Sequence, residues 1–246
     1  MKIITISVAK GGVGKTTTAA ALAQAAAYKG HRVLAVDLDP QGHFSIAINA
    51  DMDAGNTYQL LAGAPAARLI QTTPQGIDAI PAAWELSTLT TEHGSARRLQ
   101  RALKPIRERY DIIVIDTPTI SGELQFNALQ ASTDLVIPVW ADTFSLQALY
   151  LTVDTARQIQ KTNPELNIAG IVFTNFRGTT NHARQIRDVV TGKAEELGVP
   201  CLGAVRVGIA VQEAATLRRS LFEYAGKCNP ARDYLDVYEK LITQGV

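Results

Sequence analysis

The sequence predicts an α/β fold with a doubly wound, mostly parallel sheet and helices on both faces. Short runs rich in Ile and Val alternate with longer stretches of helical composition, which is the pattern of successive β-α-β units. The apolar runs are nearly continuous, as in strands that are covered on both faces. A chain of 246 residues is long enough to bury a sizeable core. We therefore expect a single domain over residues 1–246.

The individual elements follow from these runs and from the residues that interrupt them. The seven expected strands are Lys2–Val8, Arg32–Asp37, Ile77–Pro81, Asp111–Asp116, Leu135–Val139, Ile168–Thr174 and Cys201–Val205. The expected helices are Lys15–Lys29, Ala96–Arg109, Gly122–Gln130, Ser145–Lys161, Asn181–Leu197 and Pro230–Leu241. Gly30 stands where the first helix needs a left-handed C′ residue. Residues 42–73 contain several helix breakers, so we expect short helices and loop there.

Composition narrows the class of protein. The chain is 46% hydrophobic and 19% charged with a net charge of +1, as in an ordinary soluble globule. Cys201 and Cys228 lie too far apart for a C-x-x-C motif, and we expect both to be reduced packing residues. No apolar run reaches the roughly 18 residues of a transmembrane helix, and the start of the chain lacks the regions of a signal peptide. We expect a cytoplasmic protein.

A glycine-rich segment directly follows the first expected strand and reads Ala9-Lys10-Gly11-Gly12-Val13-Gly14-Lys15-Thr16-Thr17. Glycines let backbone N–H groups curl around a phosphate, and the next helix offers its N-terminus to the same anion. In such loops the second lysine reaches the β- and γ-phosphates and the following hydroxyl ligates Mg²⁺. The common G-x-x-x-x-G-K-[ST] pattern has glycine where this chain has Ala9, and Lys10 is an additional cation.

Carboxylates follow two other expected strands. The motif Val36-Asp37-Leu38-Asp39-Pro40-Gln41-Gly42 ends one strand, and Asp116 closes the run Tyr110-Asp111-Ile112-Ile113-Val114-Ile115. Doubly wound sheets bind their ligands at these carboxyl ends, and an acid after an apolar strand is the Walker B arrangement that holds Mg²⁺. Each aspartate alone is more often a helix cap or a solvated loop residue. The three motifs together, in this order, predict a nucleotide site.

The chain resembles the ParA/Soj partition ATPases, which belong to the ParA/MinD family of P-loop NTPases with a deviant Walker A loop. The resemblance covers nearly the whole chain and rests on KGGVGKTTTAAALA, VDLDPQG, YDIIVIDTP, FNALQASTDLVIPV and VQEAATLRRSLFEY. It implies a Mg²⁺-dependent ATPase with slow basal turnover. The implied ATP-binding residues are Lys10, Gly11, Gly12, Val13, Gly14, Lys15, Thr16 and Thr17, with Asn175 at the adenine base. The implied catalytic residues are Lys10, Lys15 and Asp39, and the implied Mg²⁺ ligands are Thr16, Asp39 and Asp116.

The resemblance also implies partners. Lys10 is expected to reach the nucleotide of a second subunit, so that ATP favours a sandwich homodimer. The dimer is expected to bind double-stranded DNA without sequence preference, and a ParB-like or cargo adaptor protein to stimulate hydrolysis. Residues 177–232 hold nine Lys/Arg against five Asp/Glu, a mild basic excess. Candidate DNA contacts are Arg184, Arg187, Arg218 and Arg219, with Arg177, Lys193 and Arg206 as further contributors; solvated helix faces carry arginines at this density as well.

Two other classes of function compete with DNA partition. A MinD-like regulator at the membrane surface needs a basic amphipathic C-terminal helix, whereas residues 233–246 contain three acids and one lysine. We expect the apolar side chains there to pack on the sheet, and we expect no stable membrane association. An iron–sulfur reductase ATPase needs cysteines in other regions, and a synthetase needs a second substrate pocket that no motif locates.

Because the first strand begins within a few residues of Met1, we also expect no N-terminal helix-turn-helix extension. Trp84 and Trp140 follow apolar runs and are expected to pack.

Overall fold

A computed structural model of the chain describes residues 1–89, 95–119, 122–142 and 144–244. Within these ranges one sheet has eight strands in the order β3-β4-β2-β5-β1-β6-β7-β8. The strands are β1 (Lys2–Ile6), β2 (Val33–Asp37), β3 (Gln71–Thr72), β4 (Asp78–Ile80), β5 (Ile112–Asp116), β6 (Asp134–Val139), β7 (Asn167–Phe176) and β8 (Cys201–Arg206). All neighbours are parallel except β3 with β4. The predicted doubly wound, mostly parallel sheet is confirmed.

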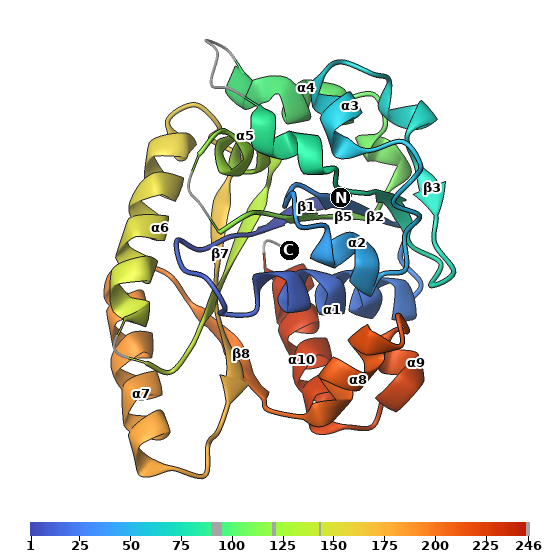
Figure 1. Cartoon of the computed structure of the whole chain (residues 1–246). Helices are drawn as coiled ribbons and strands as arrows, with labels where there is room; N and C mark the ends of the chain where they lie inside the picture. Colours follow the sequence, from blue (N-terminus) through green and yellow to red (C-terminus); the bar gives the residue numbers. More distant parts are fainter. Residues whose placement is uncertain (90–94, 120–121, 143, 245–246) are drawn as a thin grey trace.

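Helices cover both faces of this sheet (Figure 1). The α-helices are α1 (Lys15–Tyr28), α2 (His43–Ala47), α3 (Thr57–Leu61), α4 (Arg98–Leu103), α5 (Glu123–Ala131), α6 (Ser145–Gln160), α7 (Asn181–Glu196), α8 (Ile209–Thr216), α9 (Leu221–Ala225) and α10 (Asn229–Thr243). Short 3₁₀ turns are η1 (Ala66–Arg68), η2 (Trp84–Thr88), η3 (Ser95–Arg97) and η4 (Arg107–Arg109). Helices α1, α2 and α8–α10 share one core with one face, and α3–α7 pack on the other.

The alternation of side chains along β1 explains the two cores. Ile4 and Ile6 lie in the core with α1, whereas Ile3 lies in the core with α3 and α4. Helix α1 is rich in alanine and buries most of its length around Leu22, which is fully buried. The small side chains of α1 let this helix lie between the sheet and α10. This packing fixes the position of the glycine loop that precedes α1.

The structure corrects several expected elements. The helix expected over Ala96–Arg109 ends at Leu103, because Pro105 cannot continue it, and a separate 3₁₀ turn follows. Helices α8 and α9 were not expected, and neither was β3, the antiparallel strand at the sheet edge. Residues 42–70 form short helices and loop as expected, whereas β3 occupies the end of the segment that was expected to be loop. Gly30 has a φ of 84° after α1, the left-handed backbone that its position predicts.

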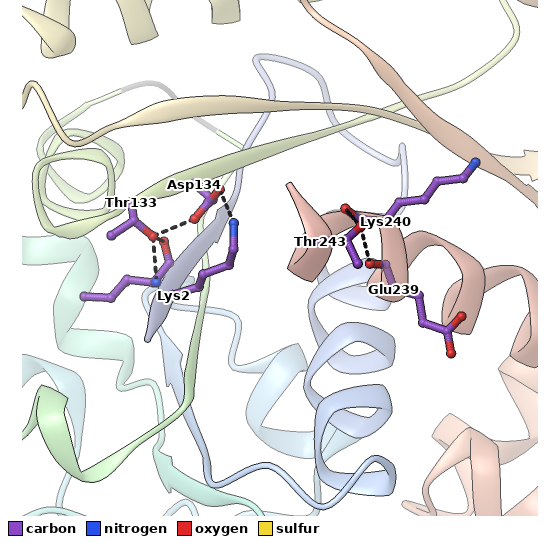
Figure 2. Close-up of polar contacts among 7 residues, drawn as sticks. Lys2, Thr133, Asp134, Glu239, Lys240 and Thr243 are labelled. Atoms are coloured by element: carbon purple, nitrogen blue, oxygen red, sulfur yellow. Dashed lines mark hydrogen bonds and ion pairs between the residues drawn. The ribbon is translucent and has the colours of Figure 1, made fainter. Parts of the chain in front are cut away.

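Hydrogen bonds fasten the N-terminal end of β1, which lies at the opposite end of this strand from the glycine loop. Lys2 Nζ donates to Asp134 Oδ1 at 3.0 Å, and Thr133 Oγ1 accepts from the backbone N–H of Ile3 at 2.9 Å and donates to Asp134 Oδ2 at 2.6 Å (Figure 2). These contacts join the first residues of β1 to the entry of β6. They fix the register of the strand that leads into the glycine loop.

Candidate nucleotide and magnesium site

Two glycines of the loop after β1 have a left-handed backbone conformation. Gly12 has a φ of 72° and Gly14 a φ of 81°, conformations that glycine adopts at little cost. Gly14 is also the N-cap of α1, and no described side chain caps this helix. The first N–H groups of α1 therefore lack intrahelical acceptors and point toward the loop. This arrangement is a phosphate cradle.

Lys15 lies beneath this cradle with a side chain that is almost fully buried. Its Nζ donates to the carbonyl oxygen of Lys10 at 3.0 Å and to Thr119 Oγ1 at 3.3 Å. Burial lowers the pKa of the Lys15 ammonium, while the carboxylates of Asp116 and Asp39 oppose this effect. Both oxygens that it contacts are neutral, so an anionic phosphate is a stronger partner for this ammonium.

Asp116 ends β5 and is fully buried. Its Oδ2 accepts a hydrogen bond from Thr16 Oγ1 at 2.7 Å, whereas its Oδ1 is buried with no hydrogen-bond partner among the described residues. Burial raises the pKa of the Asp116 carboxyl well above its usual value, and the charge of Asp37 raises it further. An orphaned carboxylate oxygen beside a loop hydroxyl is a donor set suited to Mg²⁺.

The two carboxylates after β2 have different environments. Asp37 is buried opposite Asp116 in the sheet register and accepts hydrogen bonds from the N–H of Asp39 and from the N–H and hydroxyl of Ser45. Burial raises the pKa of the Asp37 carboxyl to about 6. Asp39 is partly exposed, and its Oδ1 accepts from the N–H of Gln41 at 3.0 Å. Asp37 therefore anchors the loop, and Asp39 presents a carboxylate to a ligand.

These residues fit a magnesium ion that is bound together with a nucleotide. In the described parts of the chain, no group of three or more His, Cys, Asp or Glu side chains forms a protein-only metal site. Mg²⁺ in phosphoryl-transfer sites keeps several waters and uses one or two carboxylates plus phosphate oxygens. Thr16, Asp39 and Asp116 gather around Lys15 and supply that smaller set. Mg²⁺ would neutralise charge on the phosphates there.

The Lys10 side chain contacts residues outside the glycine loop. Its Nζ lies 2.5 Å from Asp142 Oδ2 and 5.9 Å from the centroid of the Phe144 ring. The sequence prediction missed Asp142, although its position three residues after β6 is the same kind of strand-end acid as Asp39. The additional lysine of the loop is thus held by the segment that leads into α6.

Asn175 is placed beside the loop. It has a φ of 51° and lines a cavity of about 230 Å³ together with Gly12, Thr17, Trp140 and Gln212. This location agrees with the expected place of an adenine base, and the contact itself stays a prediction. Trp140 was expected to be packed, but its side chain is 38% exposed, and Trp84 is 69% exposed. Both expectations of packing were wrong, because each tryptophan lies beyond the end of its apolar run.

The candidate DNA-binding arginines fall into two separate groups. Arg184 and Arg187 share α7, where Arg187 pairs with Asp188 and lies over the ring of Phe176. Arg218 and Arg219 are exposed on the turn between α8 and α9, on the other side of the molecule from α7 (Figure 1).

Arg218 has a φ of 51° just after the end of α8, and the Arg219 guanidinium carbon lies 5.9 Å from the centroid of the Tyr224 ring. Two of the further contributors have acidic partners: Lys193 pairs with Glu196 and Arg206 with Asp233. Their expected contribution to a basic surface is therefore weakened.

The glycine cradle, the buried lysine and the strand-end carboxylates define a P-loop nucleotide-binding protein. Residues 1–168 match the model of a family described as an AAA domain. The chain is 34% identical to the sporulation initiation inhibitor protein Soj of Bacillus subtilis over 99% of both chains. It is 31% identical to the chromosome partitioning protein ParA of Caulobacter vibrioides, over 99% of this chain and 95% of that protein.

A solved structure with the same fold was determined with a nucleotide and magnesium. The structure of cobyrinic acid a,c-diamide synthase from Mycobacterium smegmatis, with a bound ATP analogue and magnesium, matches with a TM-score of 0.84 and 27% identity. It covers 98% of this chain and 94% of that one. The chain belongs to the Soj/ParA family of chromosome-partitioning ATPases. The sequence predictions of an ATPase and of ATP and Mg²⁺ as its ligands are confirmed.

Proposed function

We propose that the chain is an ATP-driven partition or positioning switch. In this proposal an ATP-bound sandwich dimer holds double-stranded DNA without sequence preference. Hydrolysis, stimulated by a ParB-like or cargo adaptor protein, releases the DNA. The observation that carries the proposal is the different bonding of two lysines: Lys15 Nζ contacts an oxygen of its own loop, whereas Lys10 Nζ contacts Asp142, outside the loop. Lys10 is therefore not bound at its own cradle, and it can reach a second protomer once it leaves Asp142.

The residues of one protomer divide the work of phosphoryl transfer. Such a reaction needs placement and charge neutralisation more than covalent catalysis. The loop N–H groups and Lys15 would hold the phosphates, and Thr16, Asp39 and Asp116 would hold Mg²⁺. Asp39 would also orient the attacking water. Lys10 from the partner adds positive charge at the phosphates, so the site is complete only in the dimer. ATP then shifts the equilibrium toward the dimer because it binds the dimer more tightly.

The DNA part of the proposal rests on the turn between α8 and α9. Arg218 and Arg219 are both exposed there, and dimerisation doubles the number of such pairs. Soj and ParA relatives are chromosome-partitioning proteins by name, which favours DNA on the nucleoid as the surface that is held. Arg184 and Arg187 form a second candidate contact on α7.

Helix α10 argues against membrane attachment as the alternative. Its apolar residues Tyr234, Val237, Tyr238 and Leu241 are buried in the core that contains α1. A membrane-binding amphipathic helix needs its apolar face exposed. Across the described ranges, no helix combines the length and apolar character needed to cross a bilayer.

The proposal is tested by non-specific duplex DNA binding with ATP, with ADP and without nucleotide. We expect binding with ATP alone in the wild-type protein, and loss of that binding in Lys10→Ala. Equal binding in the three nucleotide states would contradict the switch. ATP-dependent flotation on liposomes without DNA binding would favour the membrane alternative.

A further inference from the structure

We propose that Asp142 is an internal competitor for Lys10, which holds this lysine within its own protomer until a nucleotide and a second protomer displace it. The inference rests on the proposed action of Lys10 across a dimer. Lys10 Nζ and Asp142 Oδ2 are 2.5 Å apart, and the two side chains are only 22% and 32% exposed. Lys10 must leave this contact before it reaches any phosphate of a partner.

Asp142 is arranged to receive a cation. Its Oδ1 accepts hydrogen bonds from the N–H of Phe144 and from Ser145 Oγ, both at 3.0 Å, which leaves Oδ2 for Lys10. Burial raises the pKa of the Asp142 carboxyl, but hydrogen bonds from Lys10 and Ser145 hold the pKa below its ordinary value. The Phe144 ring lies 5.9 Å from the same ammonium, within the range of a cation–π contact. The start of α6 thus supplies two partners for Lys10.

A second contact connects this ion pair to nucleotide in the same protomer. Lys15 Nζ donates to the carbonyl oxygen of Lys10 at 3.0 Å. Phosphate oxygens form stronger, charge-assisted hydrogen bonds with an ammonium than a neutral carbonyl does. When nucleotide phosphates take Lys15, the backbone of Lys10 loses a restraint. The phosphates of the partner's nucleotide then compete with Asp142 for a less firmly held side chain.

The competition of Asp142 for Lys10 should change the dimer dissociation constant by an amount that an experiment can measure. Breaking a partly exposed ion pair weakens an equilibrium by up to about fivefold. Formation of the symmetric dimer breaks two such pairs, so removing both is expected to tighten the dimer by up to about 25-fold. Because the dimer contains two such pairs, the combined effect is large enough to distinguish the release of Lys10 from a minor change in surface charge.

The test measures the dimer dissociation constant by sedimentation equilibrium with Mg²⁺ and a non-hydrolysable ATP analogue. Asp142→Asn is expected to tighten the dimer by about 2- to 25-fold, whereas Asp142→Glu keeps a carboxylate and stays near wild type. Asp154→Asn is the matched control. Asp154 is an exposed acid on α6, the helix that follows Asp142, and its carboxylate accepts from Gln158 Nε2, so its replacement leaves the dimer unchanged.

The outcomes separate this inference from the proposed function. An unchanged or weaker dimer in Asp142→Asn overturns the competition, and so does an equal tightening in Asp154→Asn. Lys10→Ala is measured in parallel. If Lys10→Ala retains the nucleotide-driven dimer, the action of Lys10 across the dimer fails. If Lys10→Ala abolishes the dimer and Asp142→Asn has no effect, only the role of Asp142 fails.

Discussion

The buried carboxylate of Asp37 gives the nucleotide-free protein a pH dependence with a defined sign. Burial raises the Asp37 pKa from 3.8 to about 6. For an acid whose folded pKa is raised, the stabilising contribution is complete below the unfolded pKa and is lost as the pH rises through the folded pKa. The relevant window therefore lies between about pH 4 and pH 7. In this window the folded protein is expected to become more stable as the pH falls.

The magnitude follows from proton linkage. Each pKa unit corresponds to about 1.4 kcal/mol, so the ionised state of Asp37 carries roughly 3 kcal/mol of unfavourable free energy in the folded protein. Between pH 7 and pH 5 this residue is expected to add about 1 kcal/mol to the free energy of unfolding. The Arg32 guanidinium holds the Asp111 pKa below its ordinary value. That pair therefore changes stability only at lower pH.

Urea unfolding of the nucleotide-free protein at pH 5 and pH 7 measures this difference. Asn at position 37 cannot titrate, so the difference in unfolding free energy between pH 5 and pH 7 should be smaller in Asp37→Asn than in the wild type by about 1 kcal/mol. Mg²⁺ with a nucleotide analogue should reduce the wild-type difference, because a cation beside Asp116 favours ionised carboxylates. Equal pH dependence in wild type and Asp37→Asn would refute the link between burial of this carboxyl and stability.

Three further predictions concern hydrolysis, DNA and the core. Asp39→Ala should keep nucleotide affinity by calorimetry but lower phosphate release by roughly 100-fold or more, and unchanged turnover would remove Asp39 from catalysis. Arg218→Ala with Arg219→Ala should reduce the slope of log DNA affinity against log salt by about 0.9 for each lost phosphate contact, and an unchanged slope would exclude the pair. Leu22→Ala should lower the free energy of unfolding by about 2–5 kcal/mol in urea, since Leu22 is fully buried; a loss under about 1 kcal/mol would contradict tight packing of α1.

Much of the fold was predictable because strands buried on both faces leave a clear apolar run. This signal is absent from the shortest strands and helices. The two residues of β3 and the five of α9 are too few to show a period, and tertiary contacts define them. The helix expected at 96–109 ends at Leu103, because Pro105 interrupts a helix even where the surrounding composition favours one.

The candidate site was predictable where motif and chemistry coincide. Lys15, Thr16 and Asp116 converge, and both the loop glycines and the strand ends carry a local signal for this. Contacts between distant segments carry no such signal. Asp142 lies 132 residues from Lys10 along the chain, and only the order of β1 beside β6 brings them together.

Mixing two inactive variants measures whether Lys10 acts across the dimer. Lys10→Ala retains Asp39, and Asp39→Ala retains Lys10, so a mixed dimer contains one site with both residues if the lysine comes from the partner. Neither variant alone should hydrolyse ATP, whereas an equal mixture should recover up to about one quarter of the wild-type rate, since half the dimers are mixed and each has one complete site. If Lys10 serves its own nucleotide, no site is complete and the mixture stays inactive, which would contradict the action of Lys10 in the partner's site.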